Sequence, residues 1–131
     1  MIISNAFGYI NMLDRAADAS YLRETVIANN IANVDTPTYK RQDVAFSNIL
    51  ENKLRQYVAE ERSLDKAVNK LTVEDTEAMQ YTEYPDYSYR LDRNNVDIDT
   101  ENVELASEYL RYSTINTSIT NDFQRFHAVI S

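Results

Sequence analysis

Side chains that commonly carry catalysis are scarce in this sequence. The 131-residue chain has no cysteine, one histidine (His127) and one glycine (Gly8). The lack of cysteine excludes disulfides, thiolate metal sites and cysteine nucleophiles. Loops that cradle phosphate need several glycines so that the backbone can approach the anion, so the Walker and dinucleotide-binding motifs are excluded as well. His127 has no second histidine or carboxylate beside it, and we interpret it as an ordinary packing or capping residue.

One group of carboxylates could bind a metal ion. Asp97, Asp99 and Glu101 lie close together in the sequence. Carboxylates are also favoured in the first turn of a helix, where they interact with the helix dipole, and this is the interpretation we prefer. A helical carboxylate enzyme would need Glu-x-x-His pairs, and the sequence contains none. We therefore expect a protein that is not an enzyme and that has no cofactor.

The charge balance argues against nucleic acid and anionic membranes as partners. The chain carries 13 basic and 21 acidic residues, for a net charge of −8, whereas phosphate groups attract clustered Lys and Arg. No apolar run approaches the ~20 residues that a membrane span needs. The segment from Met1 to Asn5 lacks the basic and apolar regions of a secretory signal. We expect no membrane insertion and no cleaved signal peptide.

The C-terminal part of the chain predicts a long helix at about 99–130. Its apolar positions recur with a spacing of four and three residues, which is typical of a helix that packs along its length against another helix. These positions are Leu105, Tyr109, Tyr112, Asn116, Ile119, Phe123, Phe126 and Ile130. Asn116 is the polar exception, and either it fixes the register of the pair or it is partly exposed.

The N-terminal part predicts a partner helix at about 4–33. It must end by Thr36, because Pro37 disfavours the helical conformation of the residue before it. Ser20 and Glu24 interrupt its apolar face. The members of that face are Ile3, Ala6, Ile10, Leu13, Ala17, Ile27 and Ile31. We call the contact between the two helices the seam. On the first helix it is formed by Ile10, Leu13, Ala17, Ile27 and Ile31, and on the second helix by the apolar C-terminal positions given above.

The predicted fold is mainly α. Of the 34 charged residues, 23 lie between positions 34 and 100, so the two ends are apolar and the middle is solvated. We expect residues 1–33 and 99–131 to form one helical domain as an antiparallel, coiled-coil-like hairpin. Residues 34–98 then form a small mixed region, with a short helix and an extended segment.

Several elements are expected within the middle region. Asp43 is a candidate cap for a short helix, and residues 60–77 fit a short helix, a loop or a mobile segment. Residues 79–91 fit an extended segment and 92–96 a turn. The apolar face of the short helix would be formed by Phe46, Ile49, Leu50, Leu54 and Tyr57. Four tyrosines, Tyr81, Tyr84, Tyr87 and Tyr89, fit either a contact surface or a half-buried strand pair.

Further apolar side chains lie off the seam of the hairpin. They are Leu22 and Val26 near the N-terminus, and Ala106, Leu110, Ile115 and Val129 near the C-terminus. Helices that are apolar on more than one face are usually buried on more than one face. Either the middle region covers these positions or neighbouring chains do.

A motif follows the first helix. It consists of Ala28, Asn29, Asn30, Ile31, Ala32, Asn33, Val34, Asp35, Thr36, Pro37, Thr38, Tyr39 and Lys40. Its three asparagine amides can hydrogen-bond free carbonyl groups at a helix end or on neighbouring chains. Asp35-Thr36-Pro37 is typical of a turn that ends a helix and changes the direction of the chain. The motif could be only a C-terminal cap and exit turn.

The motif closely resembles the N-terminal signature of bacterial flagellar axial proteins, which are the rod, hook and hook-associated subunits. A second motif directly precedes the last helix and strengthens the likeness to proximal rod proteins. It contains Tyr89, Arg90, Asp92, Asn94, Asn95, Val96 and Asp97. The resemblance covers roughly residues 1–50 and 88–131. Within the family, glycine usually stands at the position of Thr38 and often at that of Arg93. Because a β-branched residue tolerates positive φ poorly, we expect negative φ after Pro37.

The resemblance implies a structural subunit without catalytic activity. Such a subunit polymerises through its terminal helices and forms part of the drive shaft and export channel of the periplasmic rod in the basal body. It leaves the cytoplasm through the flagellar type III export apparatus without a cleaved signal. Its implied partners are copies of itself, other rod proteins, the export-gate adaptor and the membrane-anchored ring. The alternative from the residues alone is a soluble cytoplasmic helical adaptor or chaperone-like binding protein.

Overall fold

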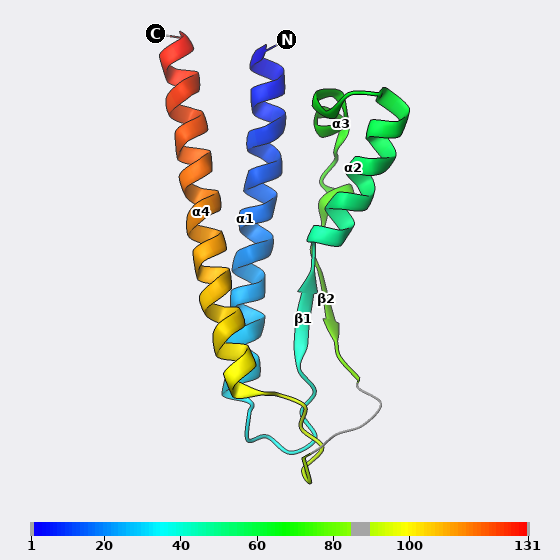
Figure 1. The fold of residues 1–131 in the computed structure, drawn as a ribbon, viewed down its shortest axis with the longest axis vertical. Helices are drawn as coiled ribbons and strands as arrows, with labels where there is room; N and C mark the ends of the chain where they lie inside the picture. The colour runs from blue at the N-terminus through cyan, green and yellow to red at the C-terminus, as the bar shows by residue number, and fades with distance from the viewer. Residues whose placement is uncertain (1, 85–89, 131) are drawn as a thin grey trace.

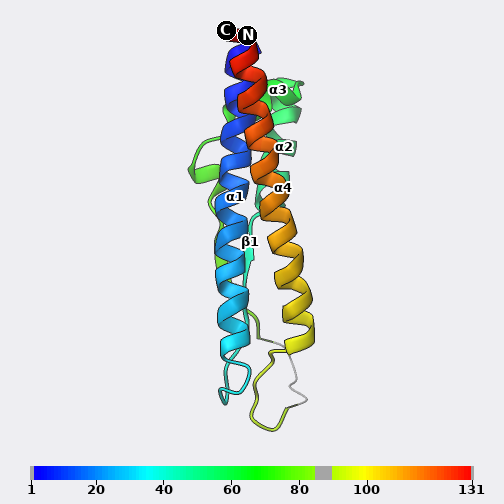
Figure 2. The ribbon, with the colours of Figure 1, turned by 90° about the vertical axis from the view of Figure 1, so that its left-hand side faces the viewer.

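The computed structural model of the chain describes residues 2–84 and 90–130. Two long helices dominate it, α1 (Ile2–Ala32) and α4 (Ile98–Ile130). They lie side by side and antiparallel, with both chain ends at the same end of the molecule (Figures 1 and 2). This confirms the predicted mainly α fold with a paired terminal hairpin. Within the described residues, no helix is long and apolar enough to cross a membrane.

The middle region forms a narrow second layer. Strands β1 (Gln42–Ala45) and β2 (Met79–Thr82) pair antiparallel, with Gln42 opposite Thr82 and Ala45 opposite Met79. Helix α2 (Ser47–Glu61), helix α3 (Leu64–Lys70) and the 3₁₀ helix η1 (Glu74–Thr76) connect the two strands. Figure 1 shows this layer on the side of α1 that faces away from α4. Helix α1 is therefore the central element.

Burial follows from the central position of α1. The buried apolar side chains are Ile10, Ala17, Ala19, Val26 and Ile27 on α1, and Val44, Ala67, Val68, Leu71 and Val96 elsewhere. Within Ile98–Ile130, which the structure describes throughout, the only buried residues are Glu101 and Glu108. Helix α1 is thus covered on two sides and α4 on one.

The apolar residues outside the seam are covered differently on the two helices. On α1, Val26 is buried and Leu22 is half-buried, because the middle region packs over them. On α4, Leu110 is 71% exposed and Val129 is 70% exposed, since nothing within the described chain covers that side. Ile115 is half-buried and Ala106 is exposed. The middle region therefore covers the first helix and leaves the second helix open.

The structure corrects the expectation for Asp43 and supplies the elements of the segment 60–77. Asp43 does not cap a helix: it lies in β1, where its carboxylate pairs with Arg23 and Arg41. Helix α2 begins four residues later, at Ser47. The segment 60–77, left open by the sequence, contains the end of α2, then α3 with Ser63 as its cap, and η1.

The expected extended segment is present only in part. Strand β2 occupies the start of it, with Tyr81 42% exposed, and Tyr84 beyond the strand is 77% exposed. Tyr87 and Tyr89 lie outside the described residues.

The expectation of negative φ after Pro37 is wrong. Thr38 has φ of 63° and Arg93 has φ of 62°. These are the positions where the resembled family has glycine, and here L-residues adopt the left-handed conformation. Tertiary contacts hold them there: the Thr38 N–H donates to the Asp92 carbonyl at 2.6 Å, and the Lys40 ammonium donates to the Arg93 carbonyl. The packing of the two loops overrides the local preference.

We expect Thr38→Gly to stabilise the protein. The left-handed conformation costs an L-residue about 1–2 kcal/mol, and glycine removes that cost while losing more entropy on folding. The expected net gain is about 0.5–1 kcal/mol in the free energy of unfolding, measured by urea denaturation. Thr38→Ala is the control, because it removes the hydroxyl and keeps the Cβ. An equal gain from the alanine variant would contradict this explanation.

Candidate functional site

The two sequence motifs meet at the end of the molecule away from the chain termini. The Asn94 amide nitrogen lies 2.8, 3.1 and 2.8 Å from the carbonyl oxygens of Asn33, Val34 and Thr36. The Asn94 carbonyl oxygen accepts from the Val96 N–H at 2.7 Å. Asn94 is fully buried. It therefore binds the carbonyl groups of the turn that follows α1, and it joins the two motifs.

Asn30 joins α1 to the first strand. Its amide nitrogen donates to the Gln42 carbonyl at 2.7 Å, and its oxygen accepts from the Gln42 N–H at 2.9 Å. The Tyr39 hydroxyl donates to the same oxygen at 3.0 Å. The side chain thus pairs with one backbone unit as a neighbouring strand would. Asn30 is fully buried, so the fold depends on these bonds.

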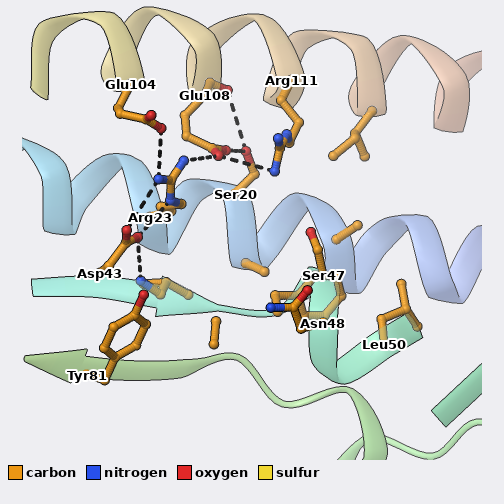
Figure 3. Close-up of a pocket in the computed structure, with 16 residues that line it drawn as sticks. Ser20, Arg23, Asp43, Ser47, Asn48, Leu50, Tyr81, Glu104, Glu108 and Arg111 are labelled. Carbon is orange, nitrogen blue, oxygen red and sulfur yellow. Dashed lines mark hydrogen bonds and ion pairs between the residues drawn. The ribbon is translucent and has the colours of Figure 1, made fainter. Parts of the chain in front are cut away.

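Arginines and carboxylates form an ionic cluster between α1, β1 and α4. We define it as Arg23, Arg41, Asp43, Glu101 and Glu108. Arg23 lies 2.8 Å from Asp43 and 2.7 Å from Glu108, and Arg41 lies 3.3 Å from Asp43 and 2.5 Å from Glu101. The side chains of Glu101 and Glu108 are each only 1% exposed. Figure 3 shows Arg23 between β1 and α4 with carboxylates on both sides.

Further polar groups complete the cluster. The Ser20 hydroxyl donates to Glu108 at 2.6 Å, and Asn30 donates to Glu101 at 3.3 Å. Glu104 pairs with Arg23 at 2.9 Å, and Glu83 pairs with Arg41 at 2.7 Å. Breaking a buried ion pair by removing one partner is strongly destabilising. The cluster therefore holds α1, β1 and α4 in one relative position.

Burial and charge act in opposite directions on the pKa of Asp43 and in the same direction on the pKa of Glu24. Burial raises the pKa of Asp43, but the hydrogen bonds from Arg23 and from the Val44 N–H outweigh it and leave that pKa below its usual value. Burial and the nearby Glu108 raise the pKa of Glu24. Glu24 Oε1 is buried and has no hydrogen-bond partner within the described part of the chain. The ionised Glu24 carboxylate is therefore unfavourable in this interior.

The other motif residues lie around these contacts. Those of the first motif that are exposed are Ala28, Asn29, Ala32, Asp35, Thr36, Pro37 and Thr38, and those that are half-buried are Ile31, Asn33, Val34, Tyr39 and Lys40. In the second motif, Arg90 pairs with Asp92 at 2.9 Å and Asn95 accepts from the Arg41 N–H at 2.6 Å. Val96 is buried. Tyr89 lies outside the described residues.

Two of the three carboxylates considered for a metal ion, Asp97 and Glu101, have structural partners. Asp97 accepts hydrogen bonds from the backbone of Asp99 at 3.1 Å and of Thr100 at 3.4 Å, which makes it a helix cap. Glu101 is held by Arg41 and Asn30. Among the described residues, no group of three His, Cys, Asp or Glu side chains is placed to hold a metal. His127 is exposed near the end of α4.

The seam residues differ in burial along the hairpin. Ile10, Ala17 and Ile27 are buried, whereas Leu13, Ile31, Leu105, Tyr112, Ile119 and Phe126 are half-buried. Tyr109, Phe123 and Ile130 are 56%, 49% and 59% exposed. Phe7 packs on Phe126 at 5.0 Å between ring centres, and Tyr21 on Tyr112 at 6.0 Å. Asn116 is exposed.

Reasoning from the sequence missed the ionic cluster. Two signals pointed to it. Ser20 and Glu24 interrupt the apolar face of the first helix, and both are buried against the region of Glu108. Glu101, Glu104 and Glu108 recur with helical spacing, so three carboxylates lie along one side of α4. The arginines that pair with them come from distant positions, and only the fold shows which ones.

Comparison with known proteins relates these features to a family. A family model described as flagella basal body rod protein matches residues 16–40. The flagellar basal body rod protein FlgB of Bacillus subtilis (strain 168) is 31% identical over 128 residues, which is 95% of this chain and 94% of the relative. The chain belongs to the FlgB family of flagellar basal body rod proteins. FlgB of Borrelia hermsii is 34% identical over 128 residues, or 92% of this chain and 94% of the relative.

The family segment has a clear place in the structure. Residues 16–40 run from the middle of α1 through its end and into the turn before β1. They include Arg23 of the ionic cluster, Asn30, and the carbonyl groups bound by Asn94. We call the junction formed by Asn94 and Asn30 the corner. The segment shared with the FlgB family therefore supplies the part of the corner that comes from α1 and from the turn after it.

We expect Asn94→Asp to be severely destabilising. An aspartate keeps the shape of the side chain but replaces its amide donors with an anion that faces three carbonyl oxygens. An uncompensated buried charge costs about 3–5 kcal/mol, and we expect a loss of about 3 kcal/mol or more in the free energy of unfolding. Asn95→Asp is the matched control, because its side-chain oxygen still accepts from Arg41. Equal losses in both variants would refute the role of Asn94.

We expect Glu24→Gln to stabilise the protein at neutral pH. The pKa of Glu24 is higher in the folded than in the unfolded state, so the folded state favours the protonated carboxyl, and this part of the stability is lost as the pH rises above the raised pKa. Glutamine removes the charge, with an expected gain of about 1 kcal/mol at pH 7.

The gain should shrink as the pH falls through the raised pKa toward the ordinary value of a glutamate, because the native side chain then becomes neutral as well. Urea denaturation of both proteins from pH 7 to pH 4 measures this. Glu74→Gln, on the exposed surface, is the control. A gain that does not depend on pH would argue against the buried charge as its cause.

Proposed function

We propose that this chain is a structural subunit of the flagellar basal-body rod and that it assembles through its terminal helices. The FlgB relatives are named as rod proteins and align with most of the chain. The observation that carries the proposal is the one-sided burial of α4. A 33-residue helix whose only buried residues within Ile98–Ile130 are two carboxylates needs cover from other molecules, because large apolar patches on monomers mark interaction sites.

We propose a division into an inner helical domain, residues 1–33 and 99–131, and an outer region, residues 34–98. In support, the middle layer lies on one side of α1 only (Figure 1), which leaves α4 at the opposite edge. The corner formed by Asn94 and Asn30 connects the two parts and sets the direction in which the outer region leaves α1. On this proposal the residues of the two motifs contribute to assembly, because they hold the corner in its geometry.

An export channel is supported by the outer face of α4. From Ser113 to Gln124 the side chains on this face are polar, uncharged and exposed, and the apolar Leu110 lies just before them; they are Ser113, Thr114, Thr117, Thr120, Asn121 and Gln124. A channel for unfolded polypeptides of varied charge needs walls that bind none of them strongly, and uncharged hydroxyl and amide groups provide this. We assign this face to the lumen of the rod.

The proposed partners follow from this position. They are copies of the chain, other rod proteins, the export-gate adaptor and the membrane-anchored ring at the rod base. The proposal includes export through the flagellar type III apparatus without a cleaved signal, and a final location in the periplasmic rod. A cytoplasmic adaptor is the alternative from composition, and the FlgB relatives do not favour it.

Deletion of the chain should abolish the rod and motility in its host bacterium. An intact copy supplied in trans should restore both, and an antibody should detect the chain in purified basal bodies. A cytoplasmic adaptor would remain in the soluble fraction. Normal flagella in the deletion strain, or absence of the chain from basal bodies, would overturn the proposal.

A further inference from the structure

Two surfaces that contain accessible apolar side chains lie on opposite sides of the terminal hairpin. The first is a ridge, which we define as Phe7, Tyr21, Tyr109, Phe123 and Ile130. Their exposed fractions are 41%, 60%, 56%, 49% and 59%. Aromatic residues are enriched in the centres of protein interfaces, so four exposed aromatic side chains and one isoleucine along one side of a helix pair form a candidate contact surface.

The second surface is a groove formed by three adjoining hollows. One hollow of about 460 Å³ lies between α1, α4 and the start of α2, and Figure 3 shows its lining. A second of about 580 Å³ follows the apolar face of α2 and shares Ser47 and Leu50 with the first. A third of about 470 Å³ continues between α1 and α4 toward the chain ends. We define the groove by Leu13, Ala16, Leu50, Leu54, Ile115 and Val129.

Helix geometry places the ridge and the groove on opposite faces. Phe7 of the ridge and Ala16 of the groove are nine residues apart on α1. At 3.6 residues per turn this is about two and a half turns, so the two side chains point in opposite directions. Tyr109 and Val129 are 20 residues apart on α4, about five and a half turns. One molecule therefore cannot fill its own groove with its own ridge.

The two surfaces match in length. The residues of α1 that line the groove run from Ala6 to Arg23, which is roughly 25 Å at 1.5 Å per residue. On α4 the ridge runs from Tyr109 to Ile130, roughly 30 Å on the same basis. The small side chains of Ala6 and Ala16 in the groove allow a large side chain of a second helix to approach.

Charge also permits two copies to meet here. The net charge of −8 opposes association of copies in general. The ridge has no charged residue, and the charged residues that line the groove have opposite partners: Glu51 with Arg55 at 2.6 Å, Glu108 with Arg111 at 3.4 Å, and Asp122 with Arg125 at 3.8 Å. Arg23 pairs likewise with Asp43 and Glu104. The contact would join two nearly neutral surfaces.

We infer that the aromatic ridge of one copy packs into the groove of the next. This inference rests on the proposed function and names the surfaces that meet. Since ridge and groove are different surfaces, the contact is heterologous and each copy keeps one free surface of each kind. Such contacts extend into rings or open helical assemblies and do not stop at a dimer. The occupant of the groove is therefore a second copy of this chain.

Cysteine cross-linking tests the contact directly, because the native chain has no cysteine. Val58→Cys on the groove wall is combined in turn with Tyr21→Cys, Tyr109→Cys and Phe123→Cys on the ridge. Each doubly substituted chain replaces the native copy in cells, and purified basal bodies are oxidised. We expect at least one pair to give a ladder of dimers, trimers and longer products, and the single variants to give none.

Val58→Cys with Thr117→Cys is the matched control, because Thr117 lies on the exposed polar face of α4. Absence of a ladder from every ridge pair, or an equal ladder from the Thr117 control, would overturn the inference. If the chain is present in basal bodies while the ladder is missing, only this contact fails and the rod function stands. If the chain is absent from basal bodies, the rod function itself fails.

A second test uses charge substitutions, so that the inference can still be judged if a cysteine variant does not assemble. Tyr109→Glu places a carboxylate in the contact, and Asn52→Glu places one outside it, because Asn52 belongs neither to the ridge, nor to the groove lining, nor to the polar face of α4. Both positions are exposed in the single chain, so both purified proteins should have the native circular dichroism spectrum. We expect Tyr109→Glu to reduce incorporation into basal bodies at least tenfold and Asn52→Glu to reduce it less than twofold. Normal incorporation of Tyr109→Glu would contradict the contact.

Discussion

The buried ionic cluster is the interaction on which the rest of the structure depends. Arg23 and Arg41 bring together carboxylates from β1 and α4, and two of these, Glu101 and Glu108, are almost completely shielded from water. Buried carboxylates are costly without partners, so an arrangement that separated them from the arginines would be strongly disfavoured. An apolar seam with a 3.5-residue repeat could slide by one repeat and still bury similar side chains. We infer that the cluster prevents this and fixes the register of α1 against α4.

The corner at the far end of the hairpin works in a similar way with neutral groups. The Asn94 amide donates to the carbonyl groups of the turn after α1, and the Asn30 amide pairs with the backbone of Gln42. Both side chains are fully buried, and an amide is suited to this because it donates and accepts at once. The strained backbone at Thr38 and Arg93 is held by hydrogen bonds from the same corner. The two sequence motifs thus form a single structural unit, although more than fifty residues separate Thr36 from Asn94.

The unequal burial of the two long helices connects the fold to assembly. Helix α1 has the middle layer on one side and α4 on the other (Figure 1), which explains its buried Val26 and Ile27. Helix α4 has only α1, so Leu110, Val129 and Ile130 remain exposed. A protein of the FlgB family whose second helix is half covered has the shape expected of a subunit rather than of a finished molecule. Glu24 is a buried residue whose Oε1 has no hydrogen-bond partner within the described part of the chain, so this interior contains a group that does not favour the stability of the single chain.

The sequence by itself determined the two terminal helices and the absence of the usual catalytic groups. Helices of this length are specified by periodicity and by Pro37, and both are local properties. The motif at Ala28 to Lys40 was sufficient to indicate the flagellar axial family. Only the tertiary structure decided the role of Asp43, which looked like a helix cap and is an ion-pair partner in a strand. It also decided the left-handed conformation of Thr38, because a hydrogen bond to Asp92 outweighs the preference of a β-branched residue. Both depend on residues far apart in the chain, and the pattern of a single segment carries no information about which distant group it will meet.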